Sequence, residues 1–195
     1  MNVPSRLLAG SLLAAGLTAA LVSGALAKNS TAVLQTTMGT MTVELFDGAA
    51  PKTVANFKAL ARKGFYDGVK FHRVIKGFMV QTGDPNTKSG DPSTWGTGNS
   101  GSFVPDEFST TLHHTKGILS MANSGSPNSQ SSQFFIMLGP APHLDGHYSI
   151  FGRVTRGMDV LDKIGNVATR PNPVMPGEQS TPVRPPVLRK VVVKG

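Results

Sequence analysis

The stretch Phe71–Asp84, FHRVIKGFMVQTGD, decides the fold and raises a question about function. Most of its residues predict β-structure, because aromatic, β-branched and other apolar side chains pack well on a pleated, half-buried surface. Arg73 lies among them, and no Asp or Glu stands beside it. Spacing alone leaves two interpretations open: an arginine that lies over the sheet surface and solvates its own end, or a cation placed there for function.

Composition limits the classes of protein. The chain has 195 residues, a length for which one domain is the default. Its 22 glycines and 14 prolines are spread along the chain, which favours many turns and short strands. Cys 0 excludes disulfides, thiol chemistry and thiolate metal sites. The net charge is +8, but the basic residues are scattered, so no nucleic-acid partner is expected. A basic barrel that binds nucleic acid or polysaccharide stays as an alternative that rests only on the isoelectric point of about 10.1.

The N-terminal segment reads as a secretory signal peptide, residues 1–27. Arg6 precedes an apolar run over Leu7–Leu26, and Ala25–Ala27 gives the small-x-small pattern of a cleavage site. The mature domain is then 28–195, exported to the periplasm of a Gram-negative bacterium, with no stable membrane insertion after cleavage. The alternatives are a secreted protein, or an uncleaved helix that anchors the chain, since the run approaches the roughly 20 residues that span a bilayer.

The pattern along the rest of the chain predicts about eight short strands and two helices. Ala32–Thr37 and Thr40–Phe46 form a hairpin around Met38-Gly39, and Pro51–Lys63 forms a helix that Gly64 can cap. The remaining strands are expected at 69–81, 116–121, 133–138, 149–154 and 187–193, and the second helix at 158–164, ended by Gly165. All-β chains remove exposed edges by closing, so an antiparallel barrel is the expected architecture.

Glycine and proline mark the irregular parts. Gly77 is expected to form a bulge inside its strand, and Pro171–Pro186 a proline-rich loop. Thr82–Phe103 predicts a long surface loop around Trp95, which either recognises something specific or only covers one end of the barrel. Its Gly96–Gly101, GTGNSG, has the letters of a dinucleotide motif but no helix after it, and is interpreted as turn glycines.

Several kinds of catalytic chemistry are missing. The five histidines form no metal-ligand spacing, no serine stands in a GxSxG elbow, and no paired carboxylates or phosphate loop occur. No metal and no cofactor are therefore expected. If the protein is an enzyme, its reaction needs no nucleophile, metal or cofactor.

Three segments, 71–84, 121–136 and 143–154, together closely resemble the cyclophilins, the peptidyl-prolyl cis-trans isomerases. The resemblance covers essentially the whole chain after residue 28. It implies an all-β fold with two helices: a closed eight-stranded antiparallel barrel capped by α-helices. It also implies an isomerase that catalyses rotation about X-Pro bonds and assists the folding of exported proteins, its partners being proline-containing peptides and unfolded clients. A non-catalytic module that binds proline-containing segments is the alternative, and a monomer is the expected state.

The resemblance also assigns site residues. Arg73 and Gln81 are the predicted catalytic residues: the Arg73 guanidinium donates to the amide nitrogen, which regains a lone pair when the bond twists, so the cation binds the twisted state best. Gln81 and Gln133 orient Arg73 and the substrate, and Ala122 and Asn123 match the edge where the substrate backbone pairs. The proline pocket matches Phe78, Met79, Phe135 and Leu144. On pattern alone the last four would be core residues, as Phe134 is expected to be, and Asn123 could be a turn residue.

The chain departs from the family pattern at three places. His143 stands where many members have tryptophan, a position tied to the binding of the drug cyclosporin, so cyclosporin binding is expected to be possible but weakened. Tyr148 stands where many members have histidine; it keeps a ring and a polar tip and stays a predicted substrate-binding residue. The stretch Ser124–Ser132 is one residue longer than in common members.

Overall fold

A computed structural model describes Met1 and residues 29–194. Residues 2–27 of the predicted signal peptide lie outside this described part. Within it no helix has the length and apolar character needed to cross a membrane. The described residues form one nine-stranded sheet, in which every strand pair is antiparallel, with two α-helices and a separate two-stranded sheet.

The elements have the following bounds. The helices are α1 (Pro51–Arg62) and α2 (Met158–Gly165), with short 3-10 helices η1 (Pro85–Lys88), η2 (Pro92–Thr94) and η3 (Pro142–Leu144). The strands are β1 (Thr31–Thr36), β2 (Gly39–Leu45), β3 (Val69–Lys70), β4 (Arg73–Ile75), β5 (Met79–Thr82), β6 (Ile118–Met121), β7 (Phe134–Met137), β8 (Ile150–Arg156), β9 (Thr169–Pro171), β10 (Gln179–Pro182) and β11 (Val187–Lys194).

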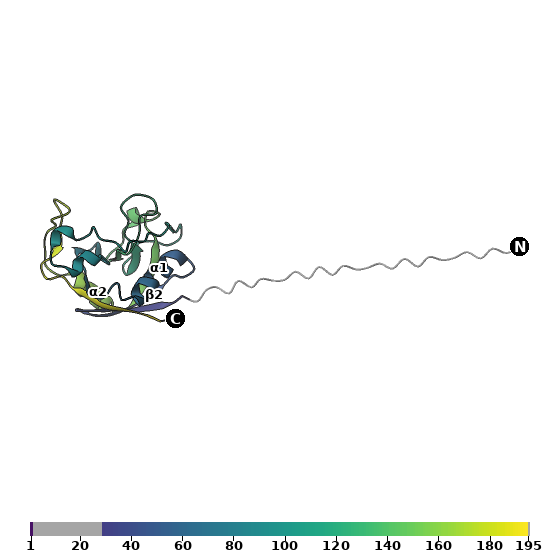
Figure 1. The fold of residues 1–195 in the computed structure, drawn as a ribbon, viewed down its shortest axis with the longest axis horizontal. Helices are drawn as coiled ribbons and strands as arrows, with labels where there is room; N and C mark the ends of the chain where they lie inside the picture. The colour runs from purple at the N-terminus through teal and green to yellow at the C-terminus, as the bar shows by residue number, and fades with distance from the viewer. Residues whose placement is uncertain (2–28, 195) are drawn as a thin grey trace.

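The large sheet joins distant parts of the chain. Its order is β3-β11-β1-β2-β8-β6-β7-β5-β4, so the first strand of the chain pairs on one side with its hairpin partner and on the other with the last strand. Figure 1 shows this: the purple strands near the start of the described chain lie beside the yellow strand near its end. The edge strands β3 and β4 are neighbours in sequence, so the sheet curls until its two ends approach.

The curled sheet confirms a mostly β, antiparallel fold with two helices, but a closed eight-stranded barrel is not confirmed. Nine strands form the sheet, and β3 and β4 end it without pairing with each other among the described residues. Phe71 and His72 separate them in the chain. The segment predicted as one strand over 69–81 is thus three short strands, because the chain turns a corner at 71–72 and again at 76–78.

Both predicted helices form. Pro51 is the first residue of α1, where its missing N–H costs no hydrogen bond, and Gly64 follows the helix with φ of +67°. Ala50 before the helix has no capping side chain; instead the Glu107 carboxylate accepts from the N–H groups of Lys52 (3.0 Å) and Thr53 (2.8 Å).

Alternation along the strands divides the apolar residues into two clusters. The larger cluster is the core inside the curled sheet, where the ring of Phe57 from α1 contacts those of Tyr66, Phe134 and Phe151 at centroid distances of 5.3, 5.5 and 5.3 Å. The smaller cluster lies on the other face of β5 and β7 and contains Phe135. Because successive side chains on a strand point to opposite faces, Phe134 is core, as expected, while Phe135 faces away.

Two predicted details are wrong. Gly77 (φ +74°) lies in the turn between β4 and β5 and is no bulge, because Val74–Ile75 and Met79–Val80 pair in continuous register across it. The segment predicted as a loop over 171–186 contains β10 and the end of β9, which pair with each other, and β10 lies against β4.

His72 occupies the corner between β3 and β4 and is 4% exposed. Neither ring nitrogen has a hydrogen-bond partner among the described residues. Burial lowers the pKa of His72 to about 4, although the nearby Asp84 carboxylate acts in the opposite direction. The folded protein therefore holds this ring neutral at pH values where an unfolded chain would protonate it.

Acid is expected to destabilise the protein through His72. Below pH 6.5 the unfolded state binds the proton first, so the free energy of unfolding falls as the pH drops from 6.5 towards 4, by about 3 kcal/mol in total. Urea unfolding at pH 7.5 and 4.5 measures this loss, and His72→Gln should reduce it by that amount. His147→Gln, at an exposed histidine, is the control. An equal loss in His72→Gln and wild type would contradict the assignment.

Candidate active site

A cavity of about 730 Å³ opens on the face of β5 and β7 that lies away from the core. Ten of the eleven sequence-predicted site residues line it, all but His143. They come from β4, β5, β7, the end of β6 and the segments around η3 and before β8. The structure therefore brings these residues together, whereas the roles given to each remain predictions.

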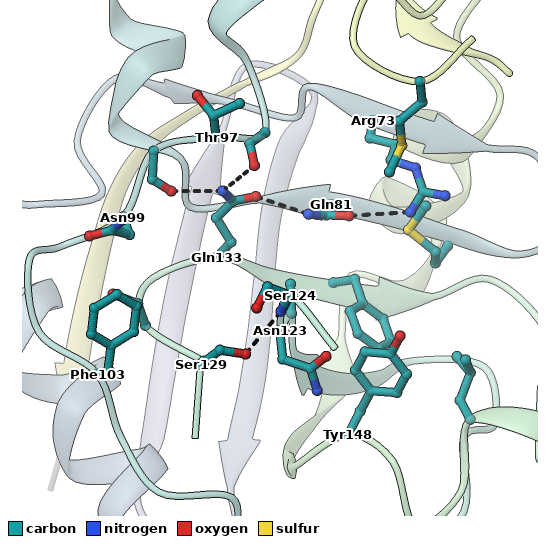
Figure 2. A pocket seen from close by; sticks show the side chains of 18 of the residues that line it. Arg73, Gln81, Thr97, Asn99, Phe103, Asn123, Ser124, Ser129, Gln133 and Tyr148 are labelled. Atoms are coloured by element: carbon teal, nitrogen blue, oxygen red, sulfur yellow. Dashed lines mark hydrogen bonds between the residues drawn. The ribbon is translucent and has the colours of Figure 1, made fainter. Parts of the chain in front are cut away.

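A row of polar side chains crosses the cavity, and Figure 2 shows Gln81 between Arg73 and Gln133. Arg73 donates from Nη1 to Gln81 Oε1 (3.3 Å), and Gln81 donates from Nε2 to Gln133 Oε1 (2.9 Å). Gln133 in turn donates from Nε2 to the carbonyls of Gly96 (2.9 Å) and Gly98 (2.7 Å). Each amide thus receives with its oxygen and gives with its nitrogen, which fixes how both glutamines are turned.

The other wall of the cavity is apolar. Phe135 is 5% exposed, and its ring packs edge-on against that of Tyr148, with centroids 5.4 Å apart and planes at 84°. Met79 is buried beside them, and Phe78 and Leu144 are half-buried. An aromatic and thioether wall of this kind suits an apolar ring such as that of proline.

Behind Phe135 lies a polar group of three, of which His114 and Ser120 are buried and Asp145 is half-buried. His114, whose ring stacks on Phe135, bonds through Nδ1 to Asp145 Oδ1 (2.7 Å) and through Nε2 to Ser120 Oγ (3.1 Å). The order resembles that of a serine nucleophile with its base, but Ser120 is 0% exposed and cannot meet a substrate. The backbone N–H of His114 lowers the pKa of Asp145 to about 2, and burial lowers that of His114. The group therefore supports the aromatic wall.

The substrate-edge residues follow β6. The N–H of Ala122 donates to the carbonyl of Gln133 (3.0 Å), which continues the pairing of β6 with β7. The Asn123 side chain closes a turn: Nδ2 donates to the His147 carbonyl (3.0 Å), and Oδ1 accepts from the N–H of Gly125 (3.1 Å). Among the described residues the main chain of Asn123 has no partner, so it is available to an extended peptide.

His143 is the predicted site residue that the structure places outside the main cavity. Its ring stacks on Phe78, with centroids 5.9 Å apart and planes at 24°. It lines an adjoining cavity of about 400 Å³, which shares Asn123, Leu144 and Tyr148 with the first. His143 therefore stands at the rim of the apolar wall.

Sequence reasoning missed four contributions to the cavity. Glu178 binds Arg73, at 2.7 Å between Oε1 and Nε. Met175 (45% exposed) and Phe103 (59% exposed) line the cavity mouth, and the Gly96–Asn99 segment forms part of its wall. No local pattern indicated Glu178, which lies in the proline-rich segment. The unusual glycine run was the one available signal for the wall.

The described residues contain no cluster of three His, Cys, Asp or Glu side chains that could hold a metal ion. The cavity therefore offers one cation, two oriented amides, an apolar wall and an open main-chain edge. Such a set can bind an extended peptide with an apolar ring and place a positive charge beside one of its amides.

Comparison with known proteins places the chain among relatives of one kind. Residues 31–193 match the family model described as cyclophilin type peptidyl-prolyl cis-trans isomerase/CLD. A peptidyl-prolyl cis-trans isomerase-like 1 of Aspergillus niger is 52% identical over 140 residues, which cover 69% of this chain and 80% of the relative. Peptidylprolyl isomerase domain and WD repeat-containing protein 1 of Mus musculus is 48% identical over 77% of this chain, but the match spans only 23% of that longer protein.

Solved structures agree. A crystal structure of a cyclophilin type peptidyl-prolyl cis-trans isomerase of Cryptosporidium parvum superposes with a TM-score of 0.75 at 32% identity, covering 86% of this chain and 98% of that one. A second structure of the same protein, in the presence of the dipeptide Ala-Pro, superposes with a TM-score of 0.74 and covers 85% and 99%.

Proposed function

The chain belongs to the family of cyclophilin-type peptidyl-prolyl cis-trans isomerases, and on that basis we propose that it catalyses rotation about X-Pro peptide bonds. The observation that carries the proposal is the position of Arg73. Its Nη1 lies in the same cavity as the apolar wall and is oriented by a hydrogen bond to Gln81. A cation therefore lies in the cavity whose wall we assign to the proline ring.

The reduction in activation free energy that catalysis requires is within reach of the groups in the cavity. The amide barrier is about 18–20 kcal/mol, and uncatalysed rotation takes roughly 10–100 s at 25 °C. Millisecond turnover requires a barrier lower by about 5–7 kcal/mol, at about 1.36 kcal/mol per tenfold in rate. One aimed donor supplies roughly 3–4 kcal/mol. Fixing the ring against Phe135 while the main chain of Asn123 holds the preceding residues supplies the rest by orientation.

Arg73 acts on the twisted state in this mechanism. When the amide twists, its nitrogen loses resonance, regains a lone pair and accepts a hydrogen bond that the planar amide does not accept. A guanidinium donor placed at that nitrogen binds the transition state better than either planar isomer. The Gln81–Gln133 row keeps the donor in place, and no bond is broken, so no nucleophile or cofactor is needed.

Arg73→Ala is expected to lower the catalysed cis-to-trans exchange of a short Ala-Pro peptide by about 100- to 1,000-fold, since it removes the aimed donor. NMR exchange measurements on the chain from Lys28 onwards would give the rate. Arg153→Ala is a matched control, because Arg153 pairs with Glu44 on the exposed face of β8 and β2 and does not line the cavity.

The same experiment separates the alternatives. If neither wild type nor variant accelerates exchange but both bind the peptide, the chain is a proline-binding module and the isomerase proposal fails. Full activity in Arg73→Ala would remove the role given to the arginine. Salt-dependent binding to DNA with no effect on peptides would favour the basic-barrel alternative.

The proposal includes a place of action: an exported monomer that assists the folding of proteins in the periplasm of a Gram-negative bacterium. The support is the sequence of residues 1–27 and the lack of cysteine. The relatives named above are eukaryotic and contribute nothing to this part of the proposal. The mass of the protein isolated from its native cells is expected to correspond to a chain that begins at Lys28. A mass that retains Met1 would overturn cleavage and favour the anchored form.

Cyclosporin binding is proposed to be weakened by His143. The imidazole covers Phe78 but offers less apolar surface than the indole that many family members carry at this position. His143→Trp is expected to tighten the inhibition constant of cyclosporin by about tenfold, measured on the exchange assay. His147→Trp, at the other exposed histidine of the adjoining cavity, is the control. Tight inhibition of wild type that His143→Trp leaves unchanged would contradict this.

A further inference from the structure

Glu178 forms a two-pronged contact with Arg73, although 105 positions separate them in the chain. Nε donates to Oε1 at 2.7 Å, and Nη2 donates to Oε2 at 2.8 Å. Two parallel charge-assisted bonds of this kind fix the plane of a guanidinium as well as its position. The two side chains are 21% and 25% exposed, so water is partly excluded from the pair.

The carboxylate occupies one edge of the guanidinium and leaves the other free. The Nε–Nη2 edge is bound to Glu178, whereas the one partner of Nη1 among the residues that the structure describes is Gln81, at the longer distance of 3.3 Å. An arginine has five N–H donors in a rigid fork, so holding one edge aims the remaining donors without using them. Nη1 is therefore the part of Arg73 that a substrate in the cavity can meet.

The loop that carries Glu178 is itself firmly built. Asn172 Oδ1 accepts from the N–H groups of Val174 (2.9 Å) and Met175 (3.1 Å), and its Nδ2 donates to Ser180 Oγ (2.9 Å). The main chain of Glu178 is bonded on both sides, its N–H to the Met175 carbonyl (3.2 Å) and its carbonyl to the Asn172 N–H (2.8 Å). The main chain that carries the carboxylate is thus held in place, unlike that of a freely moving surface residue.

The opposite end of the row is equally fixed. Gln81 and Gln133 connect Arg73 to the carbonyls of Gly96 and Gly98, so the guanidinium is held between two separate loops. Arg73 belongs to a short strand at the edge of the sheet, where a long side chain would otherwise have many rotamers. Contacts from both sides restrict it to one.

We propose that Glu178 is a positioning residue: it holds the Nε–Nη2 edge of Arg73 so that Nη1 faces the twisting amide. The inference rests on the proposed isomerase function and extends it to a residue in the β9–β10 segment. Hydrogen bonding from Arg73 lowers the pKa of Glu178, with burial opposing, so the carboxylate stays ionised and keeps both acceptors at neutral pH. Loss of the contact should spoil the aim of the donor and leave the proline pocket intact.

The test compares Glu178→Ala and Glu178→Gln with wild type, in the NMR exchange assay on an Ala-Pro peptide. Misaiming a donor affects the transition state more than substrate binding, so kcat should fall about tenfold in Glu178→Ala while KM stays within about twofold. Glu178→Gln keeps the size and one acceptor and should fall less. Glu44→Ala is the control, since Glu44 also accepts from an arginine Nε, that of Arg153, through one bond of 2.7 Å outside the cavity.

A second measurement does not depend on catalysis. In ¹⁵N–¹H spectra the Nε–H of Arg73 should give a resolved signal with slow solvent exchange in wild type and in Glu44→Ala. The signal should be lost in Glu178→Ala and exchange faster in Glu178→Gln, which keeps one acceptor. In the Arg73→Ala background, Glu178→Ala should have no further effect on the residual rate, because the two residues act as one unit.

The outcomes separate the two proposals. An active wild type whose kcat is unchanged in Glu178→Ala, or a variant with higher kcat, would overturn the positioning role; the latter would mean that Glu178 restrains Arg73. A rise in KM with kcat unchanged would also overturn it, since it would place Glu178 in peptide binding. A wild type without activity would overturn the proposed function and this inference with it, whatever the Nε–H signal shows.

Discussion

The alternation of side chains between the two faces of β4, β5 and β7 is the constraint on which both the core and the cavity depend. In each strand one set of side chains enters the curled sheet and the next faces the cavity: Val80 is in the core, whereas Met79 and Gln81 are on the other side. Arg73 is paired directly with Gln81 in the β4–β5 register, and Gln81 with Phe135 across β7. A shift of the register by one residue would bury the guanidinium and expose the core, so the packing of the interior also fixes the polar row.

This constraint explains what the sequence could predict. Hairpins and helices depend on local signals, such as Gly39 at the start of β2 and Pro51 at the start of α1, and these elements form within one or two residues of the predicted bounds. The site residues on β5 and β7 followed from a motif long enough to be specific. Phe135 was distinguished from the core residue Phe134 only by the family resemblance, because the pattern alone would have placed both in the core; in the structure they face opposite sides of β7.

What could not be predicted depends on contacts between distant segments. Nothing near Glu178 indicates that it meets Arg73, because the contact joins residues 105 positions apart and the intervening turns decide it. Strands β9 and β10 were not predicted, because the prolines around them normally indicate a segment that does not pair in a sheet. The same strands can form a closed barrel or a curled sheet whose edge strands β3 and β4 do not pair. The number of strands alone therefore could not establish closure.

The pairing of β1 with β11 has a consequence for how the protein is made. Thr31 lies opposite Lys194, so an inner strand of the sheet lacks one neighbour until almost the whole chain is present. Contacts of such long range form late and slowly, because most of the chain must be ordered before they stabilise anything. A polypeptide that emerges from a ribosome or crosses a membrane N-terminus first therefore cannot complete this sheet midway. The molecule becomes a folded protein only after its last strand arrives, and until then it remains the kind of incomplete chain that folding factors bind.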